Sequence, residues 1–220
     1  MLKIENVEIH GWNAAIRGMR NAMNSWDQSD SYWTHIENPE TENTAPFAFF
    51  LGEKDLHLAS TLVSAGDDHG KWMRYVDVDL DIVAPLYWWK EFDTYKVGTI
   101  ANSCSTMHKI HAKEFTVDDF SCEHLSHDKN AGVGVLLTII EALNLNREIF
   151  VRSKGNDKSF WWNMIQLLPS SYNQRRTIRL NYSVLRRMYF ARRTHKLDEW
   201  HTFCDWIETL PYAEELIICE

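Results

Sequence analysis

The segment YWWKEFDTYKVGTIANSCSTMHK, residues 87–109, combines residue types that can hold a small anionic ligand. Lys96 can give a phosphate a charge-assisted contact, and backbone N–H groups near Gly98 can approach the same group. The run from Asn102 to Thr106 adds hydroxyl groups and the thiol of Cys104. We therefore expect this segment to contribute to a site for a phosphate-bearing ligand.

Aromatic residues in the same segment have two interpretations. Trp88, Trp89 and Tyr95 can stack on the ring of a base or a cofactor, or they can pack in the core. Trp88 and Trp89 are adjacent, which favours a core position for at least one of them. The hydroxyls of Ser103 and Ser105 can equally belong to a polar turn.

Two kinds of reactive chemistry fit the cysteines and histidines. Cys104 has a nucleophilic side chain, and His108, four residues on, could act as its base. Zinc is the alternative, because Cys122, His124 and His127 lie close together in the sequence, with further Cys and His residues upstream. The Cys-x-His-x-x-His spacing matches no standard structural zinc motif, so we predict no metal site.

A basic segment runs from Lys158 to Leu197 without a single Asp or Glu, although the whole chain has a net charge of −8. An acidic protein with one basic segment suits small anions such as nucleotide phosphates better than duplex DNA. The alternative is a solvated face whose arginines pair with acidic neighbours. The sequence also lacks a Gly-rich phosphate motif of the Walker or Rossmann kind.

Bulk properties are those of a globular protein of 220 residues. One domain, residues 1–220, is the better expectation for this length. No apolar run is long enough to cross a membrane, and no secretory signal pattern is present. The four cysteines show no paired spacing, which favours reduced thiols in the cytoplasm. Ten tryptophans exceed what one core of this size needs and favour an oligomer interface.

Apolar periodicity predicts an α/β fold with a mixed sheet and long helices. Pro85 is placed to start a helix. In the segment 176–193, Ile178, Tyr182, Leu185 and Tyr189 form one helical stripe. The expected strands are 2–9, 46–51 and 72–82, and the expected helices are 11–26, 86–95, 132–145, 158–168, 176–193 and 198–210.

This order of elements resembles that of the flavin-dependent thymidylate synthases, most clearly in the C-terminal third. There the family has a Leu-Pro, a short polar turn, and then an Asn, a Leu and an Arg at set distances. Leu168-Pro169, Asn181, Leu185 and Arg192 fall at those distances. Asp198-Glu199-Trp200 takes the place of the family's next helix motif after an apparent one-residue insertion.

The family signature is not retained. Where the family has Arg-His-Arg, seven residues and a Ser, this chain has Thr94-Tyr95-Lys96, with Cys104 at the position of the serine. Lys90-Glu91 lies where the family has Arg-Gln. Upstream, Gly66 and His69 resemble part of the family's Gly-His-x-Ser-x-x-Glu-His segment. The chain therefore resembles a divergent member of the flavin-dependent thymidylate synthases.

The resemblance implies a reaction and its ligands. A reduced flavin, from FAD, supplies hydride, and methylene-tetrahydrofolate supplies one carbon to the base of dUMP; NADPH would reduce the flavin. It also implies a homotetramer with sites at subunit interfaces. The alternative is a homologue that has lost catalysis and binds or sequesters a nucleotide.

Resemblance and residue type together assign the candidate site residues. The catalytic candidates are Cys104 and Arg193. The cofactor-binding candidates are His69, Arg74, Tyr95, Lys96 and Asn181. The substrate-binding candidates are Lys90, Glu91, Ser103, Ser105 and Arg192.

Overall fold

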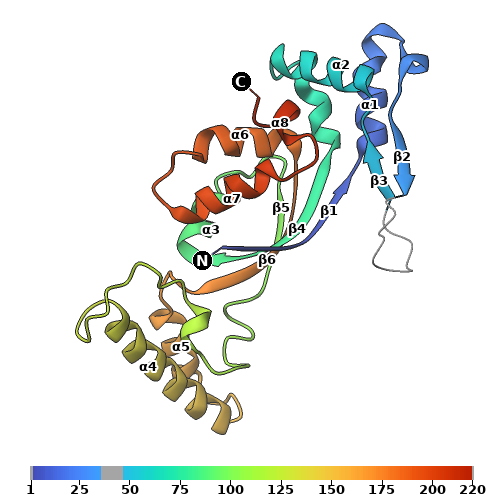
Figure 1. Cartoon of the computed structure of the whole chain (residues 1–220). Coiled ribbons are helices and arrows are strands. Elements are labelled where there is room, and N and C mark those ends of the chain that lie inside the picture. Colours follow the sequence, from blue (N-terminus) through green and yellow to red (C-terminus); the bar gives the residue numbers. More distant parts are fainter. Residues whose placement is uncertain (1, 36–46, 220) are drawn as a thin grey trace. The chain divides into compact units, whose positions relative to one another are not determined.

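The computed structural model describes residues 2–35 and 47–219, and the chain divides into two compact units (Figure 1). Unit 1 comprises residues 1–6, 80–96 and 100–178, and unit 2 comprises residues 7–79, 97–99 and 179–220. Strands β1, β4 and β6 each contribute residues to both units. Helices and strands alternate along the chain, which confirms the α/β class; the expectation of one domain over 1–220 stays a prediction.

The elements follow one another in this order: β1 (Lys3–His10), α1 (Trp12–Arg20), η1 (Asn21–Met23), η2 (Trp26–Gln28), β2 (Tyr32–His35), β3 (Phe47–Phe50), α2 (Glu53–Ser64), η3 (Gly70–Tyr75), β4 (Asp77–Pro85), α3 (Leu86–Phe92), β5 (Ile100–Ser103), η4 (Val117–Asp119), α4 (Val133–Arg152), α5 (Lys158–Leu167), β6 (Asn173–Asn181), α6 (Tyr182–Arg192), α7 (Asp198–Glu208) and α8 (Ala213–Leu216). Those labelled η are short 3₁₀ helices. No helix among the described residues combines the length and apolar character needed to cross a bilayer.

Two sheets are present among the described residues. The larger has the strand order β1-β4-β6-β5, and the smaller is an antiparallel pair, β2-β3, in which Tyr32 lies opposite Phe50. Strand β4 alternates strictly, with Val78, Leu80 and Ile82 buried between half-buried aspartates. This period of two is the pattern of a strand with one buried face.

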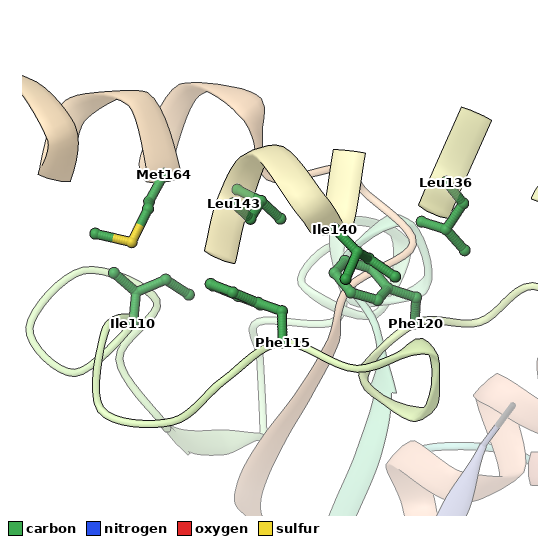
Figure 2. Close-up of a cluster of buried hydrophobic side chains, with 7 residues drawn as sticks. All are labelled: Ile110, Phe115, Phe120, Leu136, Ile140, Leu143 and Met164. Atoms are coloured by element: carbon green, nitrogen blue, oxygen red, sulfur yellow. The ribbon is translucent and has the colours of Figure 1, made fainter. Parts of the chain in front are cut away.

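One part of the core of unit 1 is a cluster of seven buried apolar side chains (Figure 2). Helix α4 provides three of them, and α5 provides Met164. The loop from residue 110 to 120 provides the others, Ile110, Phe115 and Phe120. The α4–α5 pair and this loop thus form one packed body.

Aromatic residues dominate the core of unit 2. Trp12 of α1 stacks on Phe49 at a centroid distance of 5.4 Å and meets Tyr182 edge-on at the same distance. Trp200 and Phe203 of α7 are fully buried. Several of the ten tryptophans, whose number favoured an oligomer interface, are therefore core residues, and the oligomeric state stays a prediction.

The largest difference from the expected elements lies at 176–193. Instead of one helix, residues 173–181 form strand β6, and α6 begins at Tyr182. Ile178 and Leu180 are buried while Thr177 and Arg179 are exposed, so the first part follows a period of two. The stripe from Ile178 to Tyr189 is buried as expected, but it is shared between a strand and a helix.

The boundaries of other elements also differ from those expected from the sequence. The expected strand 72–82 begins only at Asp77, because 70–75 form the 3₁₀ helix η3. Pro85 directly precedes helix α3, as expected. The strand expected at 46–51 is present as β3, except that residue 46 lies outside the described residues. The elements that the sequence did not predict are α2, α8, β2 and β5.

A buried ion pair organises the first part of unit 2. The Arg20 Nε donates to Asp55 Oδ1 at 2.6 Å, and both side chains are at most 5% exposed. The other oxygen of Asp55 accepts from the hydroxyls of Ser29 and Ser31. Burial acts to raise the pKa of Asp55, but the hydrogen bonds outweigh it and hold the pKa below its usual value of 3.8.

We expect Asp55→Asn to lower the free energy of unfolding by about 3–5 kcal/mol at neutral pH, because it leaves the Arg20 charge buried and unpaired. The carboxylate's contribution is complete above the unfolded-state pKa of 3.8 and is lost as pH falls through the lower native pKa. Urea unfolding of both proteins against pH should show the difference shrinking in acid. A difference independent of pH would contradict this account.

Asn181 caps helix α6. Its side-chain oxygen accepts from the backbone N–H of Val184 at 3.1 Å, and the residue is only 8% exposed. The cap marks the point at which β6 becomes α6.

Asn181→Ala should therefore destabilise the protein by about 1 kcal/mol, whereas Asn181→Ser, which keeps a capping oxygen, should cost much less. Thermal unfolding of the two variants measures the difference. Equal losses in both would show that the cap does not matter.

Candidate functional site

The tryptophans of the segment 87–109 belong to the core. Trp88 and Trp89 are 0% and 1% exposed, and both lie on α3. The indole N–H of Trp89 donates to the backbone oxygen of Gln174 at 2.9 Å. Arg176 lies over the Trp89 ring, 4.3 Å from its centroid, and pairs with Asp93. Neither tryptophan is exposed enough to stack on a ligand.

The charged residues of this segment lie on its surface. Lys90 and Lys96 are exposed, and Glu91 and Tyr95 are half-buried. All four lie outside the four clefts found among the described residues. Gly98 has a φ of +82°, and a Cβ there would approach Val184 Cγ2 to 2.9 Å. A glycine is therefore required at this position so that the chain can pack against the start of α6, whether or not it also contacts a phosphate.

A polar cleft in unit 1 contains two of the predicted residues. This Cys104 cleft has a volume of about 340 Å³, and its lining includes Cys104, Ser105, Lys113, Asp119, Tyr172, Asn173 and Arg175. Cys104 is held at the end of β5: its N–H donates to Arg175 O at 2.9 Å, and its carbonyl accepts from Gln174 Nε2 at 2.7 Å. The exposed thiol side chain is thus fixed beside β6.

The cations around the Cys104 cleft are already paired, whereas the carboxylate of Asp118 in its lining forms no ion pair with another described residue. Arg175 pairs with Glu5 at 3.0 Å and with Asp81 at 2.7 Å. Hydrogen bonds from Thr177, Arg175 and Asn6 lower the pKa of Asp81 to about 2, so it stays charged. Lys113 pairs with Asp119. A cleft with internally paired charges suits a neutral polar group better than a free phosphate.

Ser105 forms a turn as well as lining this cleft. Its hydroxyl accepts the backbone N–H groups of Met107 and His108, at 3.1 and 2.9 Å. This geometry agrees with the polar-turn alternative. Ser103 is exposed at the end of β5. Within residues 2–35 and 47–219, no group of three or more Cys, His, Asp or Glu side chains is arranged to hold a metal ion.

A second cleft, in unit 2, brings together His69 and Arg74. This His69 cleft has a volume of about 920 Å³, and its lining includes Asp68, His69, Lys71, Trp72, Arg74 and Tyr75. Helix η3 positions most of these residues. The side chains of Lys71 and Arg74 are exposed, and neither forms an ion pair with another described residue. The unpaired cations make this cleft suitable for an anion.

Trp72 gives the His69 cleft an aromatic wall. The side chain is 3% exposed, and its buried indole N–H has no hydrogen-bond partner among the described residues. Tyr75, in contrast, is 56% exposed and contributes an accessible ring. The cleft therefore combines cations with aromatic surface.

The arginines at the end of α6 stack on aromatic rings. Arg192 lies 4.7 Å from the centroid of Trp200, and Arg193 lies 4.9 Å from that of Phe190. The first guanidinium is partly buried and the second exposed. Neither lines one of the four clefts, so their predicted roles in substrate binding and catalysis stay predictions.

The middle of α6 faces a third cleft of about 470 Å³, lined in part by Ser183 and Arg187. Arg186 also lines it but donates to the carbonyls of Ile217 and Cys219. From the sequence we expect Arg186 and Arg187 to be dispensable for ligand binding or to serve subunit contacts. The contacts of Arg186 give it a structural role at the C-terminal segment.

The structure thus brings the predicted residues together in pairs rather than in one site. Cys104 and Ser105 share one cleft, and His69 and Arg74 share another. The sequence missed Tyr172, Asn173, Lys113 and Asp119. Tyr172 lies three residues after Pro169 of the Leu168-Pro169 motif, and that position was the available signal.

Comparisons by sequence and by structure gave different results. No protein-family model matches the chain, and no curated protein matches it by sequence. Solved structures do match. Thymidylate synthase X from Helicobacter pylori, determined with FAD and dUMP, has a TM-score of 0.65 and 13% identity, covering 99% of this chain and 98% of that one.

Two further structures agree. A second structure of the Helicobacter pylori flavin-dependent thymidylate synthase, complexed with FAD and dUMP, has a TM-score of 0.63 and 14% identity over 97% of this chain and 98% of that one. The UMP/dUMP methylase PolB from Streptomyces cacaoi, bound with 5-Br dUMP, has a TM-score of 0.59 and 13% identity, with coverage of 98% and 93%. The chain therefore has the fold of the flavin-dependent thymidylate synthases.

Proposed function

We propose that this protein binds a pyrimidine nucleoside monophosphate such as dUMP and, with FAD, transfers one carbon to its base. One observation carries the proposal: almost the whole chain shares its fold with a synthase determined with FAD and dUMP and with a UMP/dUMP methylase bound to 5-Br dUMP. These two structurally similar proteins have different names, yet one was determined with dUMP and the other with 5-Br dUMP. The shared ligand class supports nucleotide binding more directly than any particular reaction.

The His69 cleft fits the cofactor. Its volume of about 920 Å³ is that of a small-molecule site. Lys71, Arg74 and His69 supply donors for a pyrophosphate, and Tyr75 supplies a ring on which an aromatic group can stack. When bound, the flavin would supply the hydride chemistry. We assign these residues to holding its charged part.

The Cys104 cleft fits the base of the nucleotide. Its cations are paired within the chain, and apart from the carboxylate of Asp118 its remaining donors and acceptors are neutral. Cys104 would place its sulfur beside the bound ring, where it is the candidate nucleophile. His108 lies in the turn after Ser105, and no contact between its side chain and the thiol is seen among the described residues.

Other roles assigned from the sequence remain part of this proposal. Tyr95, Lys96 and Asn181 would contact the cofactor; Arg193 would act in catalysis. The residues assigned to substrate binding are Lys90, Glu91, Ser103, Ser105 and Arg192. We further propose a cytoplasmic homotetramer in which subunits meet at the sites, with methylene-tetrahydrofolate as carbon donor and NADPH as reductant.

A second candidate function is nucleotide binding without flavin chemistry. The sequence Thr94-Tyr95-Lys96 at the place of the Arg-His-Arg signature favours it. Of the two arginines in the signature, one is replaced by another cation, Lys96, and the other by the neutral Thr94. The stacking of Arg192 and Arg193 on aromatic rings also leaves them less available to a flavin.

Ligand binding by the purified protein separates the two functions. We expect dUMP to bind in isothermal titration calorimetry, and we expect the protein to show the visible absorption of oxidised flavin, either as purified or after addition of FAD. Binding of dUMP by a protein that FAD does not colour would establish the second function. Failure to bind dUMP would contradict both.

Arg74→Ala should weaken FAD binding by roughly 10- to 100-fold, because a charge-assisted contact is worth about 1.5–3 kcal/mol. Stability should change little, since Arg74 is exposed. The matched control is Arg152→Ala, which removes an exposed arginine that pairs with Glu148 on α4 and lies outside the clefts. Fluorescence titration of both variants with FAD measures the effect. Equal affinities would exclude the His69 cleft as the cofactor site.

A further inference from the structure

Tyr172 carries a hydroxyl group that makes no hydrogen bond to another described residue. Its ring packs on the core cluster of unit 1, edge-on to Phe120 at 5.7 Å and to Phe115 at 6.3 Å. Its backbone is fixed as well, because its carbonyl accepts the N–H of Leu86 and its N–H donates to Pro169. The side chain is therefore held rigidly at the wall of the Cys104 cleft. The hydroxyl has no hydrogen-bond partner among the described residues.

Burial, helped by a neighbouring carboxylate, keeps this phenol protonated. Burial, and then the negative charge of Asp119, raise the pKa of Tyr172 above its usual value. Asp119 cannot easily take the proton, because Lys113 and the N–H and hydroxyl of Thr116 already occupy its carboxylate. Tyr172 is thus available to the cleft as a neutral O–H donor.

Asn173 adds a second donor beside it. The hydroxyl of Ser121 donates to Asn173 Oδ1 at 2.8 Å, which fixes the orientation of the amide. The NH₂ group makes no hydrogen bond to another described residue and belongs to the lining of the same cleft. A rigid phenol and an oriented amide NH₂ form a pair that favours a ligand with carbonyl oxygens.

We propose that Tyr172 and Asn173 determine base specificity in the Cys104 cleft by both donating to the O4 carbonyl oxygen of a uracil ring, which can accept two hydrogen bonds. Cytosine has an amino group where uracil has its O4 carbonyl. That amino group would face the NH₂ of Asn173 and the hydroxyl of Tyr172 and leave both donors without an acceptor at that position. A site built around such donors discriminates strongly against a ligand that lacks the acceptor. This inference rests on the proposed function and names the residues that read its substrate.

The test is the ratio of the dissociation constants of dCMP and dUMP, measured by calorimetry on the full-length protein. Wild type should bind dUMP about 10-fold or more tightly than dCMP. Tyr172→Phe should reduce that ratio by about 3- to 10-fold, the effect of one neutral hydrogen bond. Asn173→Asp keeps an oxygen for Ser121 and replaces the NH₂ by an acceptor, so it should reverse the preference towards dCMP.

Tyr189→Phe is the matched control. It also removes a phenol, one that donates to Glu208 in unit 2, and it should lower stability without changing the ratio. An unchanged ratio in both Tyr172→Phe and Asn173→Asp, with dUMP still bound, would overturn this inference and leave the proposed function intact. A wild-type preference for dCMP, with Asp118 of the same cleft as acceptor, would overturn it as well. Binding of neither nucleotide would overturn the proposed function and the inference together.

Discussion

The pairing of aspartates on β4 with arginines on β6 is the constraint on which the candidate sites depend. In unit 1, Asp81 accepts from Arg175 and Thr177; in unit 2, Asp79 accepts from Arg179. The opposite faces of the two strands bury aliphatic side chains. A slip of one residue would bury the charges and expose the aliphatic residues, so the register is strongly specified.

Several functional positions follow from that register. Strand β6 holds the backbone of Cys104 through Arg175 and Gln174. Its first residue is Asn173, and its last, Asn181, caps α6. The same arginine that balances Asp81 also lines the Cys104 cleft. Charge pairing that fixes the strand therefore also occupies this arginine, which leaves it less available to a phosphate.

Local patterns predicted much of the fold and less of the site. Helices α4, α5 and α7 were predictable because their apolar residues repeat at helical spacing. Strand β6 was not, because Ile178, Tyr182 and Leu185 fit a helical stripe equally well. Both tryptophans of α3 are buried. Their adjacent positions in the sequence do not predict this, because neighbouring residues on a helix point about 100° apart. The grouping of Cys104 with Tyr172 depends on contacts between distant segments, which single-sequence patterns do not encode.

The ring of Tyr172 links the Cys104 cleft to the core of unit 1. Phe115 and Phe120 come from a loop that also covers α4 and α5, as Figure 2 shows for the cluster. Replacement of either phenylalanine during evolution would shift the phenol without altering a residue that touches the ligand. If Tyr172 reads the ligand as proposed, ligand preference and fold stability in this unit are inherited together, and a lineage that changes one must compensate in the other.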